Sequence, residues 1–368
     1  MKLRFNRLET AEALSALCSV AAPRTPKEIL KCVRLEARAD VLLLSATDLE
    51  LSLRCAITQV EIDEPGEALV LADTLAKIVR ECDDELLSVE TAGNNLHVRG
   101  KGSHFQIVTQ DPADFPPIPE MEGEPDITID HDVLSRLVER SAFSAAREST
   151  RYAINGVLWE VEGKRLTLAA TDGRRLAVAH GEVSTVGDNV SQNAIVPGKA
   201  LSLFTRLPTE PNTQVGVKIT ANQLHLNMGR AMMSTALVEG QFPKYQDVVP
   251  SDCDRLVELN TAEFQSALKR AAVLTNEESK GVRLSFSEGT LTLSSRTPDQ
   301  GEATISIPVS FEGELLEIGF NPVFFLDMLK VVHTDKITLA LKQADRPAVI
   351  RLGDEFVYVV MPVNLSSA

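Results

Sequence analysis

A pattern of two consecutive apolar strands occurs three times in this chain, and it constrains the fold more than any other feature. The three starts are Cys32-Val33-Arg34-Leu35, Gly156-Val157-Leu158-Trp159 and Gly281-Val282-Arg283-Leu284. They lie 124 and 125 residues apart, and each is followed by a second apolar run, at 41–46, 165–170 and 290–295. A fixed period of this length in a chain of 368 residues predicts three similar tandem domains. We place them at 1–124, 125–252 and 253–368.

Each repeat is predicted to consist of two halves of similar build. A short strand precedes an amphipathic helix in the windows 8–20, 132–143 and 262–271. A later strand leads directly into a second helix in the windows 73–81, 199–206 and 323–333, and paired strands close each half. The chain is therefore predicted to be α+β, with about six helices and six small sheet segments. Helices are expected on one face of each domain and antiparallel sheets on the other.

Composition and charge narrow the functional classes. The net charge of −15 argues against a protein that binds nucleic acid over its whole surface. The six helix windows together hold nine basic and eight acidic residues. That count alone favours ordinary solvated helix faces over nucleic-acid binding. Arginines at predicted helix ends, Arg24, Arg147 and Arg151, could nevertheless reach a phosphate backbone.

The cysteines and the apolar runs bear on the compartment. Five cysteines form an odd set without a Cys-x-x-Cys pair, and the start MKLRFNRLET lacks an apolar signal segment. We therefore expect a reducing, cytoplasmic environment. No apolar run reaches the length needed to cross a membrane, so no membrane partner is expected.

Catalytic motifs are weak throughout the chain. Val196-Pro197-Gly198-Lys199-Ala200 resembles the end of a phosphate loop, but the first glycine and the magnesium-binding hydroxyl are missing. Ser266-Ala267-Leu268-Lys269 matches one hydrolase motif without its two companions. The six histidines have no metal-ligand spacing. Thr171-Asp172-Gly173 is most simply a tight turn after an apolar strand, and Trp159 is expected in the core. The sequence predicts a protein that is not an enzyme and has no catalytic residues, metal or cofactor.

Several motifs, in order and spacing, resemble one known family over the whole chain. They are Ala46-Thr47-Asp48-Leu49-Glu50, Ala113-Asp114-Phe115-Pro116, Arg151-Tyr152 with Asn155-Gly156, Ala170-Thr171-Asp172-Gly173-Arg174-Arg175-Leu176-Ala177, Gly240-Gln241-Phe242-Pro243, Gly281-Val282-Arg283-Leu284 and Val359-Val360-Met361-Pro362. With these motifs the chain resembles the beta subunit, or beta sliding clamp, of bacterial DNA polymerase III.

The resemblance implies three tandem domains of the DNA clamp fold, with helices lining the inner face of a ring and antiparallel sheets outside. Two copies would join head to tail and encircle duplex DNA without reading its sequence. The ring would tether the replicative polymerase for processive DNA replication. Expected partners are double-stranded DNA, the polymerase III alpha subunit, the clamp loader, and other polymerases and repair proteins that carry short linear peptides.

The resemblance also implies a set of DNA-contacting residues. These are Arg24, Arg80, Arg151, Tyr152, Lys199 and Arg206. The chain departs from the family at Asp73 and Thr74, where a basic pair is usual, and at Asp247, which replaces a basic residue. These departures predict weaker direct contact with DNA.

Two further surfaces follow from the resemblance. The dimer interface would join the first domain of one copy to the third domain of the other through Leu75, Ile78, Phe105, Val273 and Leu274. An apolar pocket for partner peptides would lie between the second and third domains, formed by Ile154, Thr171, Gly173, Arg174, Arg175, Leu176, Pro243, Val248, Val359, Met361, Pro362 and Val363. Both sets could instead be domain core or packing at a domain junction.

One alternative from another class stays open at this stage. A repeat scaffold of the same fold, or a paralogue that has lost basic contacts, would bind proteins without encircling DNA. The acidic Asp73 and Asp247 favour this alternative.

Overall fold

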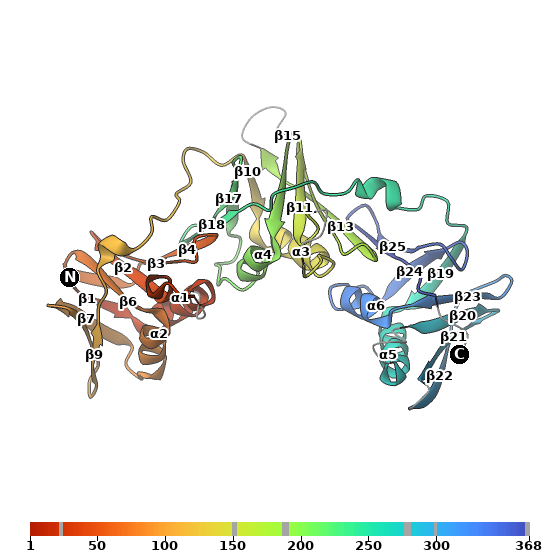
Figure 1. Cartoon of the computed structure of the whole chain (residues 1–368), viewed down its shortest axis with the longest axis horizontal. Coiled ribbons are helices and arrows are strands. Elements are labelled where there is room, and N and C mark those ends of the chain that lie inside the picture. The colour runs from red at the N-terminus through yellow and green to blue at the C-terminus, as the bar shows by residue number, and fades with distance from the viewer. Residues whose placement is uncertain (22–24, 149–152, 186–190, 276–280, 298–299, 365–368) are drawn as a thin grey trace. The chain divides into compact units, whose positions relative to one another are not determined.

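The computed structural model describes residues 1–21, 25–148, 153–185, 191–275, 281–297 and 300–364. It divides into two compact units. Unit 1 combines Met1–Ser135 with Val183–Leu237, and unit 2 combines Arg136–Glu182 with Val238–Ala368. The second sequence repeat is thus shared between the units, so the domain boundaries predicted from the sequence remain a prediction. Figure 1 labels the helices and strands.

Unit 1 contains two antiparallel sheets. The five-stranded sheet has the order β5 (Val60–Glu64), β1 (Lys2–Asn6), β7 (Leu86–Ala92), β8 (Asn95–Arg99) and β9 (His104–Val108). The nine-stranded sheet has the order β14 (Ser184–Thr185), β10 (Ile127–Asp130), β16 (Gln214–Ile219), β17 (Gln223–Asn227), β18 (Ala231–Ala236), β4 (Leu51–Ile57), β3 (Val41–Thr47), β2 (Cys32–Arg38) and β6 (Gly66–Leu71).

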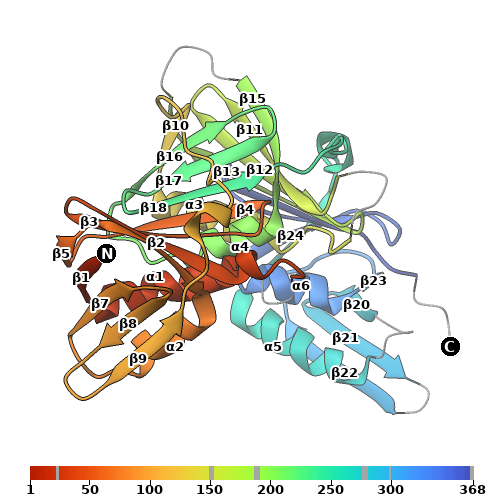
Figure 2. The same cartoon turned by 60° about the vertical axis from the view of Figure 1, so that its left-hand side comes forward.

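The helices of unit 1 arise where the sequence combines a cap with an apolar stripe. α1 (Arg7–Val20) begins after Asn6, whose side chain accepts a hydrogen bond from the Glu9 N–H at 3.1 Å. Its buried stripe includes Leu14, Leu17 and Val20. α1 packs beside α2 (Ala72–Glu81), as Figure 2 shows. β15 (Ser191–Pro197) leads directly into α4 (Gly198–Phe204), and α3 (His131–Ala142) begins in this unit.

Unit 2 also contains a long and a short run of paired strands. The long run has the order β11 (Gly156–Glu162), β12 (Arg165–Thr171), β13 (Arg175–Glu182), β26 (Phe356–Val360), β25 (Ala348–Leu352), β24 (Lys336–Leu341) and β19 (Arg255–Asn260). The four-stranded sheet has the order β22 (Gly301–Pro308), β21 (Thr290–Thr297), β20 (Val282–Ser287) and β23 (Leu316–Phe320). α5 (Thr261–Ala271) packs along β21 and β22 and against α6 (Pro322–Leu329) (Figure 2).

Four short 3₁₀ segments complete the described elements. They are η1 (Glu28–Lys31), η2 (Pro112–Asp114), η3 (Tyr245–Val248) and η4 (Ala272–Leu274). Among the described helices, none is both long enough and apolar enough to cross a membrane. All five cysteines are unpaired.

The α+β class and the helix windows are confirmed, since the described residues form six α-helices within these windows or one residue outside them. The described strands form four sheets, because four of the six predicted sheet segments are joined in pairs. Sheet segments of neighbouring repeats fuse: β18 pairs with β4, and β13 pairs with β26, both antiparallel. The sequence did not mark β13 because residues on both of its faces are buried, so the period-2 alternation is lost. Trp159 is fully buried, as predicted.

Candidate functional site

The turn between β12 and β13, residues 171–175, is closed by side chains of its own. The Thr171 hydroxyl donates to the Arg175 carbonyl at 2.6 Å and accepts the Gly173 N–H at 3.0 Å. The Asp172 carboxylate accepts the N–H groups of Arg174 and Arg175 at 2.9 and 3.1 Å. Gly173 has φ +84°, a left-handed conformation that favours glycine. The predicted tight turn is therefore present, with its hydrogen bonds satisfied internally.

Arg175 ties this turn to the third repeat. Its guanidinium donates to Asp172 Oδ2 at 3.0 Å, to Asp327 Oδ2 at 2.9 Å and to the Phe143 carbonyl at 2.9 Å. The guanidinium carbon also lies 4.7 Å from the centre of the Phe324 ring. Its side chain is 10% exposed, so Arg175 acts mainly as an internal anchor of the predicted peptide pocket.

The ionisation of this cluster follows from its contacts. Burial by itself opposes ionisation of Asp327, but hydrogen bonds from Lys330 and Arg175 hold the pKa of Asp327 below its usual value. Burial likewise opposes the charge on Arg175, yet Asp327 raises the pKa of Arg175 overall. Both groups are charged, which makes the pair a fixed link between β13 and α6. No pattern in the sequence indicated Asp327, because only the fold brings a residue 152 positions away to Arg175.

The end of β26 lies against the same turn. Leu176 pairs with Val359 and Arg175 with Val360 in the strand register. Beyond the strand, the Met361 N–H donates to the Arg174 carbonyl at 2.8 Å. The Val363 N–H donates to the Gly319 carbonyl at 2.8 Å, which fixes the segment against β23 as well. The structure thus brings together residues 171–176 and 359–363.

The twelve predicted pocket residues differ in exposure. Ile154, Thr171, Leu176 and Val359 are buried, whereas Gly173, Arg174, Val248 and Met361 are exposed and Arg175, Pro243, Pro362 and Val363 are half-buried. Pro243 and Val248 belong to a segment attached to β11, where the Tyr245 hydroxyl donates to Glu160 Oε2 at 2.5 Å. The Phe242 ring lies edge-on to Tyr245, 6.4 Å between centres. The exposed members Met361 and Val248, 40% and 54% exposed, offer apolar surface to a ligand.

The first repeat has a second turn of the same kind between β3 and β4. The Thr47 hydroxyl accepts the Leu49 N–H at 3.0 Å, and Asp48 Oδ1 accepts the N–H groups of Glu50 and Leu51 at 3.0 and 2.7 Å. Leu49 has φ +82°, almost the value of Gly173. The other oxygen of Asp48 forms an ion pair with Lys199 of α4.

The described members of the predicted DNA-contacting set are all exposed. Arg80 pairs with Glu81 at 3.2 Å, Lys199 pairs with Asp48, and the Arg206 Nε donates to the Ser202 carbonyl at 2.8 Å. Arg24, Arg151 and Tyr152 lie outside the described residues.

The predicted dimer residues fall into two groups. Val273 is 72% exposed, and Ile78, Phe105 and Leu274 are half-buried. Leu75 is completely buried within unit 1, where it belongs to the inward face of α2. The prediction that Leu75 faces a partner is corrected on this ground, because its side chain has no free surface.

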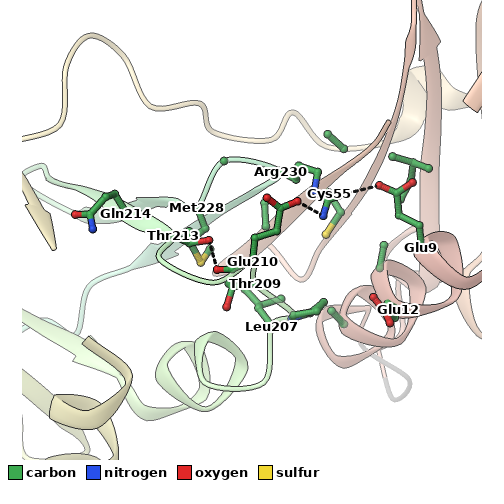
Figure 3. Close-up of a pocket in the computed structure, with 17 residues that line it drawn as sticks. Glu9, Glu12, Cys55, Leu207, Thr209, Glu210, Thr213, Gln214, Met228 and Arg230 are labelled. Atoms are coloured by element: carbon green, nitrogen blue, oxygen red, sulfur yellow. Dashed lines mark hydrogen bonds and ion pairs between the residues drawn. The ribbon is translucent and has the colours of Figure 1, made fainter. Parts of the chain in front are cut away.

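A cavity in unit 1 was not foreseen from the sequence. It has a volume of about 450 Å³ and lies between α1, β4 and the β17–β18 turn (Figure 3). Arg230 spans its rim, with ion pairs to Glu9 at 2.7 Å and to Glu210 at 2.5 Å. Cys55 lines the cavity, but burial raises the pKa of its thiol to about 12, so the thiol is protonated at neutral pH. Among the described residues no group of three or more acidic, histidine or cysteine side chains is placed to hold a metal ion.

The comparisons with known proteins cover the whole chain. Models of the N-terminal, central and C-terminal domains of the DNA polymerase III beta subunit match residues 1–119, 128–244 and 246–364. The beta sliding clamp of Vibrio cholerae is 31% identical over an alignment of 368 positions, which covers 99% of this chain and 100% of the relative. The beta sliding clamp of Escherichia coli is also 31% identical, over 99% of this chain and 100% of its own.

Solved structures agree with this similarity. The DNA polymerase III subunit beta from Pseudomonas aeruginosa superposes with a TM-score of 0.93 at 32% identity, covering 99% of this chain and 100% of its own. The DNA polymerase sliding clamp from Bacillus subtilis gives a TM-score of 0.93 at 26% identity, covering 99% of both chains. The chain therefore belongs to the family of DNA polymerase III beta subunits, the beta sliding clamps, and is a non-catalytic processivity subunit with three tandem clamp domains.

Proposed function

We propose that two copies of this chain close head to tail into a ring that encircles duplex DNA and tethers the replicative polymerase to it. The observation that carries this proposal is the way in which the repeats join within the chain. Each junction pairs the last strands of two three-stranded runs from neighbouring repeats. β4 of the first repeat pairs with β18 of the second, and β13 of the second repeat pairs with β26 of the third. Among the described strands, the corresponding ones without such a partner are β22 of the third repeat and β9 of the first.

The two internal junctions also predict the register of the missing one. The last strands β4, β13 and β22 each have one residue at the same place in the repeat: Ser52, Leu176 and Glu302. Each lies opposite the equivalent residue of the preceding strand, which is Thr47, Thr171 or Arg296. The strands β18, β26 and β9 likewise have equivalent residues, which are Ser234, Val359 and Gln106. These lie opposite His225, Val349 and His97 of the preceding strands. Inside the chain Ser52 pairs with Ser234, and Leu176 pairs with Val359. By the same rule Glu302 of one copy would pair with Gln106 of the other.

The physical cost of open edges supports this pairing. An unpaired strand edge exposes backbone donors and acceptors that readily pair with another strand. The exposed Val273 and the half-buried Leu274, in η4 directly after α5, supply apolar surface beside such a contact, as Ile78 and Phe105 do in the first repeat. Burying each large apolar side chain contributes about 1.5 to 3 kcal/mol, so a few of them can hold a ring closed. A head-to-tail contact that closes after two copies gives a homodimer.

A closed ring would explain why the protein needs few strong contacts with DNA. We propose that the helices line the inner face, where Arg80, Lys199 and Arg206, together with Arg24, Arg151 and Tyr152, contact phosphates. Such contacts are independent of sequence and weaken with salt. The net charge of −15 would leave the outer surface acidic, which limits binding of DNA from outside.

The partner site is proposed at the turn of residues 171–176 and the segment 359–363. Met361 is a flexible apolar residue that can adapt to Leu or Phe side chains of a short peptide. The polymerase alpha subunit, the clamp loader, and other polymerases and repair proteins would dock here through such peptides. The free cysteines fit the cytoplasm as the location of this assembly.

Disulfide cross-linking tests ring closure directly. A Gln106→Cys, Glu302→Cys double variant should form a covalent dimer under mild oxidation, because directly opposed strand residues lie within disulfide range. Each single variant is a control for the five native cysteines, and Gln106→Cys with Ala303→Cys is a control for register. Failure of the 106/302 pair to cross-link in a protein that is dimeric in solution would contradict the proposed junction.

A further inference from the structure

The ion pair between Asp48 and Lys199 joins the first repeat to the second within unit 1. Asp48 lies in the β3–β4 turn, and its side chain is 13% exposed, whereas the Lys199 side chain is 55% exposed. The carboxylate is held in place, since its Oδ1 atom accepts the N–H groups of Glu50 and Leu51 at 3.0 and 2.7 Å. The flexible partner in this pair is therefore the lysine.

The equivalent turn of the second repeat has a similar ion pair, but its cation is more deeply buried. In both turns one carboxylate oxygen closes the turn and the other holds a cation, Lys199 in the first and Arg175 in the second. Arg175 is 10% exposed and donates to two further acceptors, so moving it out of its site would break two more hydrogen bonds. The Lys199 side chain, by contrast, is 55% exposed and has Asp48 as its ion-pair partner. Exposed ion pairs contribute only about 0 to 1 kcal/mol, so another anion can replace the carboxylate.

We propose that Asp48 is a positioning residue that competes with DNA phosphates for Lys199, and so keeps the grip of the ring on DNA weak. This inference rests on the proposed function, in which Lys199 contacts DNA. A sliding ring benefits from contacts that break easily, and an internal carboxylate lowers the net gain from each lysine–phosphate contact. The exchange replaces one oxygen anion by another and needs no rearrangement of the turn.

Asp48→Asn separates the two roles of the carboxylate. The amide oxygen can still accept the two turn N–H groups, but the charge that holds Lys199 is lost. Binding of a short DNA duplex, followed by fluorescence anisotropy at several NaCl concentrations, should tighten by up to about fivefold at low salt. The slope of log affinity against log salt should steepen by up to about 0.9, the value for one complete additional phosphate contact.

Two comparison variants make the test specific. Glu50→Gln removes the same charge from the same turn, two residues away, and should leave the slope unchanged. In a Lys199→Ala background, Asp48→Asn should have no effect on the slope. A purely structural role for Asp48 would lower the unfolding temperature of Asp48→Asn without changing the slope, and that result overturns the inference.

The outcomes also distinguish the inference from the proposed function. If Lys199→Ala weakens DNA binding but Asp48→Asn leaves the salt slope unchanged, Lys199 contacts DNA and the competition by Asp48 is refuted. If Lys199→Ala has no effect on DNA binding, both the contact and the competition are refuted.

Discussion

The Arg175 guanidinium donates to the Asp327 carboxylate at 2.9 Å, and this contact joins a turn of the second repeat to a helix of the third. Lys330 donates to the other Asp327 oxygen at 2.8 Å, but its side chain is 69% exposed. Asp327 therefore has one buried and one exposed cationic partner, and the two contacts should differ in energy.

Removing the buried contact should cost more than removing the exposed one. Arg175→Met leaves Asp172 without its side-chain donor and should lower the free energy of unfolding by about 3 kcal/mol, as for other broken buried pairs. Lys330→Met is the matched control and should cost less than about 1 kcal/mol. Urea unfolding, followed by the fluorescence of Trp159 in the same unit, measures the free energy of unfolding of both variants. Equal effects of the two variants would show that Arg175 is not an anchor.

The two Thr-Asp turns predict opposite effects of glycine at equivalent positions. Leu49 adopts φ +82° and is 56% exposed, and a left-handed conformation costs a residue with a side chain about 1 kcal/mol or more. Leu49→Gly should therefore raise the thermal stability of the protein.

Gly173→Ala is the reciprocal change and should lower stability by about 1 kcal/mol. A Cβ atom at Gly173 meets no neighbour within 4 Å, so the effect would come from φ +84° alone. Differential scanning calorimetry measures both variants. Destabilisation by Leu49→Gly would mean that the Leu49 side chain, not the backbone, determines the turn.

His180 should make unit 2 less stable at acidic pH. Burial, with the positive charge of Arg165, lowers the pKa of His180 to about 4, and its Nδ1 atom lies 2.9 Å from the Thr167 hydroxyl. The folded pKa lies below the unfolded value of about 6.5, so the unfolded chain takes up the proton first as the pH falls. Stability from this residue is present above pH 6.5 and is lost as the pH falls towards about 4.

Replacing the imidazole should remove this part of the pH dependence. His180→Gln keeps a hydrogen-bonding side chain without a titratable group, and its urea midpoint should change less than that of the wild type between pH 6.5 and 4.5. Above pH 7 the urea midpoints of the wild type and His180→Gln should depend on pH to nearly the same extent. An unchanged pH dependence in His180→Gln would assign the acid sensitivity to other groups.

Met361→Lys should weaken the binding of partner peptides. The exposed Met361 would contact an apolar side chain, and a charge in a desolvated contact is costly. A fluorescein-labelled peptide containing adjacent Leu and Phe residues should bind at least about tenfold more weakly, a change of about 1.4 kcal/mol.

The matched control introduces the same charge elsewhere in unit 2. Leu256 is 64% exposed on β19, and Leu256→Lys should leave peptide affinity unchanged. If Met361→Lys binds the peptide as the wild type does, the proposed site is in the wrong place.

Local patterns in the sequence were sufficient to predict the helices and part of the strands. Apolar spacing identified α2, where Leu75 and Val79 are buried, and the Asp172-Gly173 pair after an apolar strand identified the turn. The same pattern could not tell which face of α2 meets a partner, so Leu75 was assigned to an interface although it belongs to the core.

Interactions between distant segments could not be predicted in the same way. β13 has buried residues on both faces, so no alternation marks it. The strands that pair with β4 and β13 are β18 and β26, which lie far along the chain. Asp327 near Arg175 and Asp48 near Lys199 are further examples, because no local pattern encodes contacts that form only when the repeats pack.

Retention on circular DNA tests the ring most directly. The protein, loaded by its clamp loader onto nicked circular DNA, should co-elute with the DNA in gel filtration. It should be released when a restriction enzyme linearises the circle, because a ring held by topology slides off free ends. Retention on the linear DNA would contradict encirclement, and failure to remain on the circle would favour a protein-binding scaffold of the same fold.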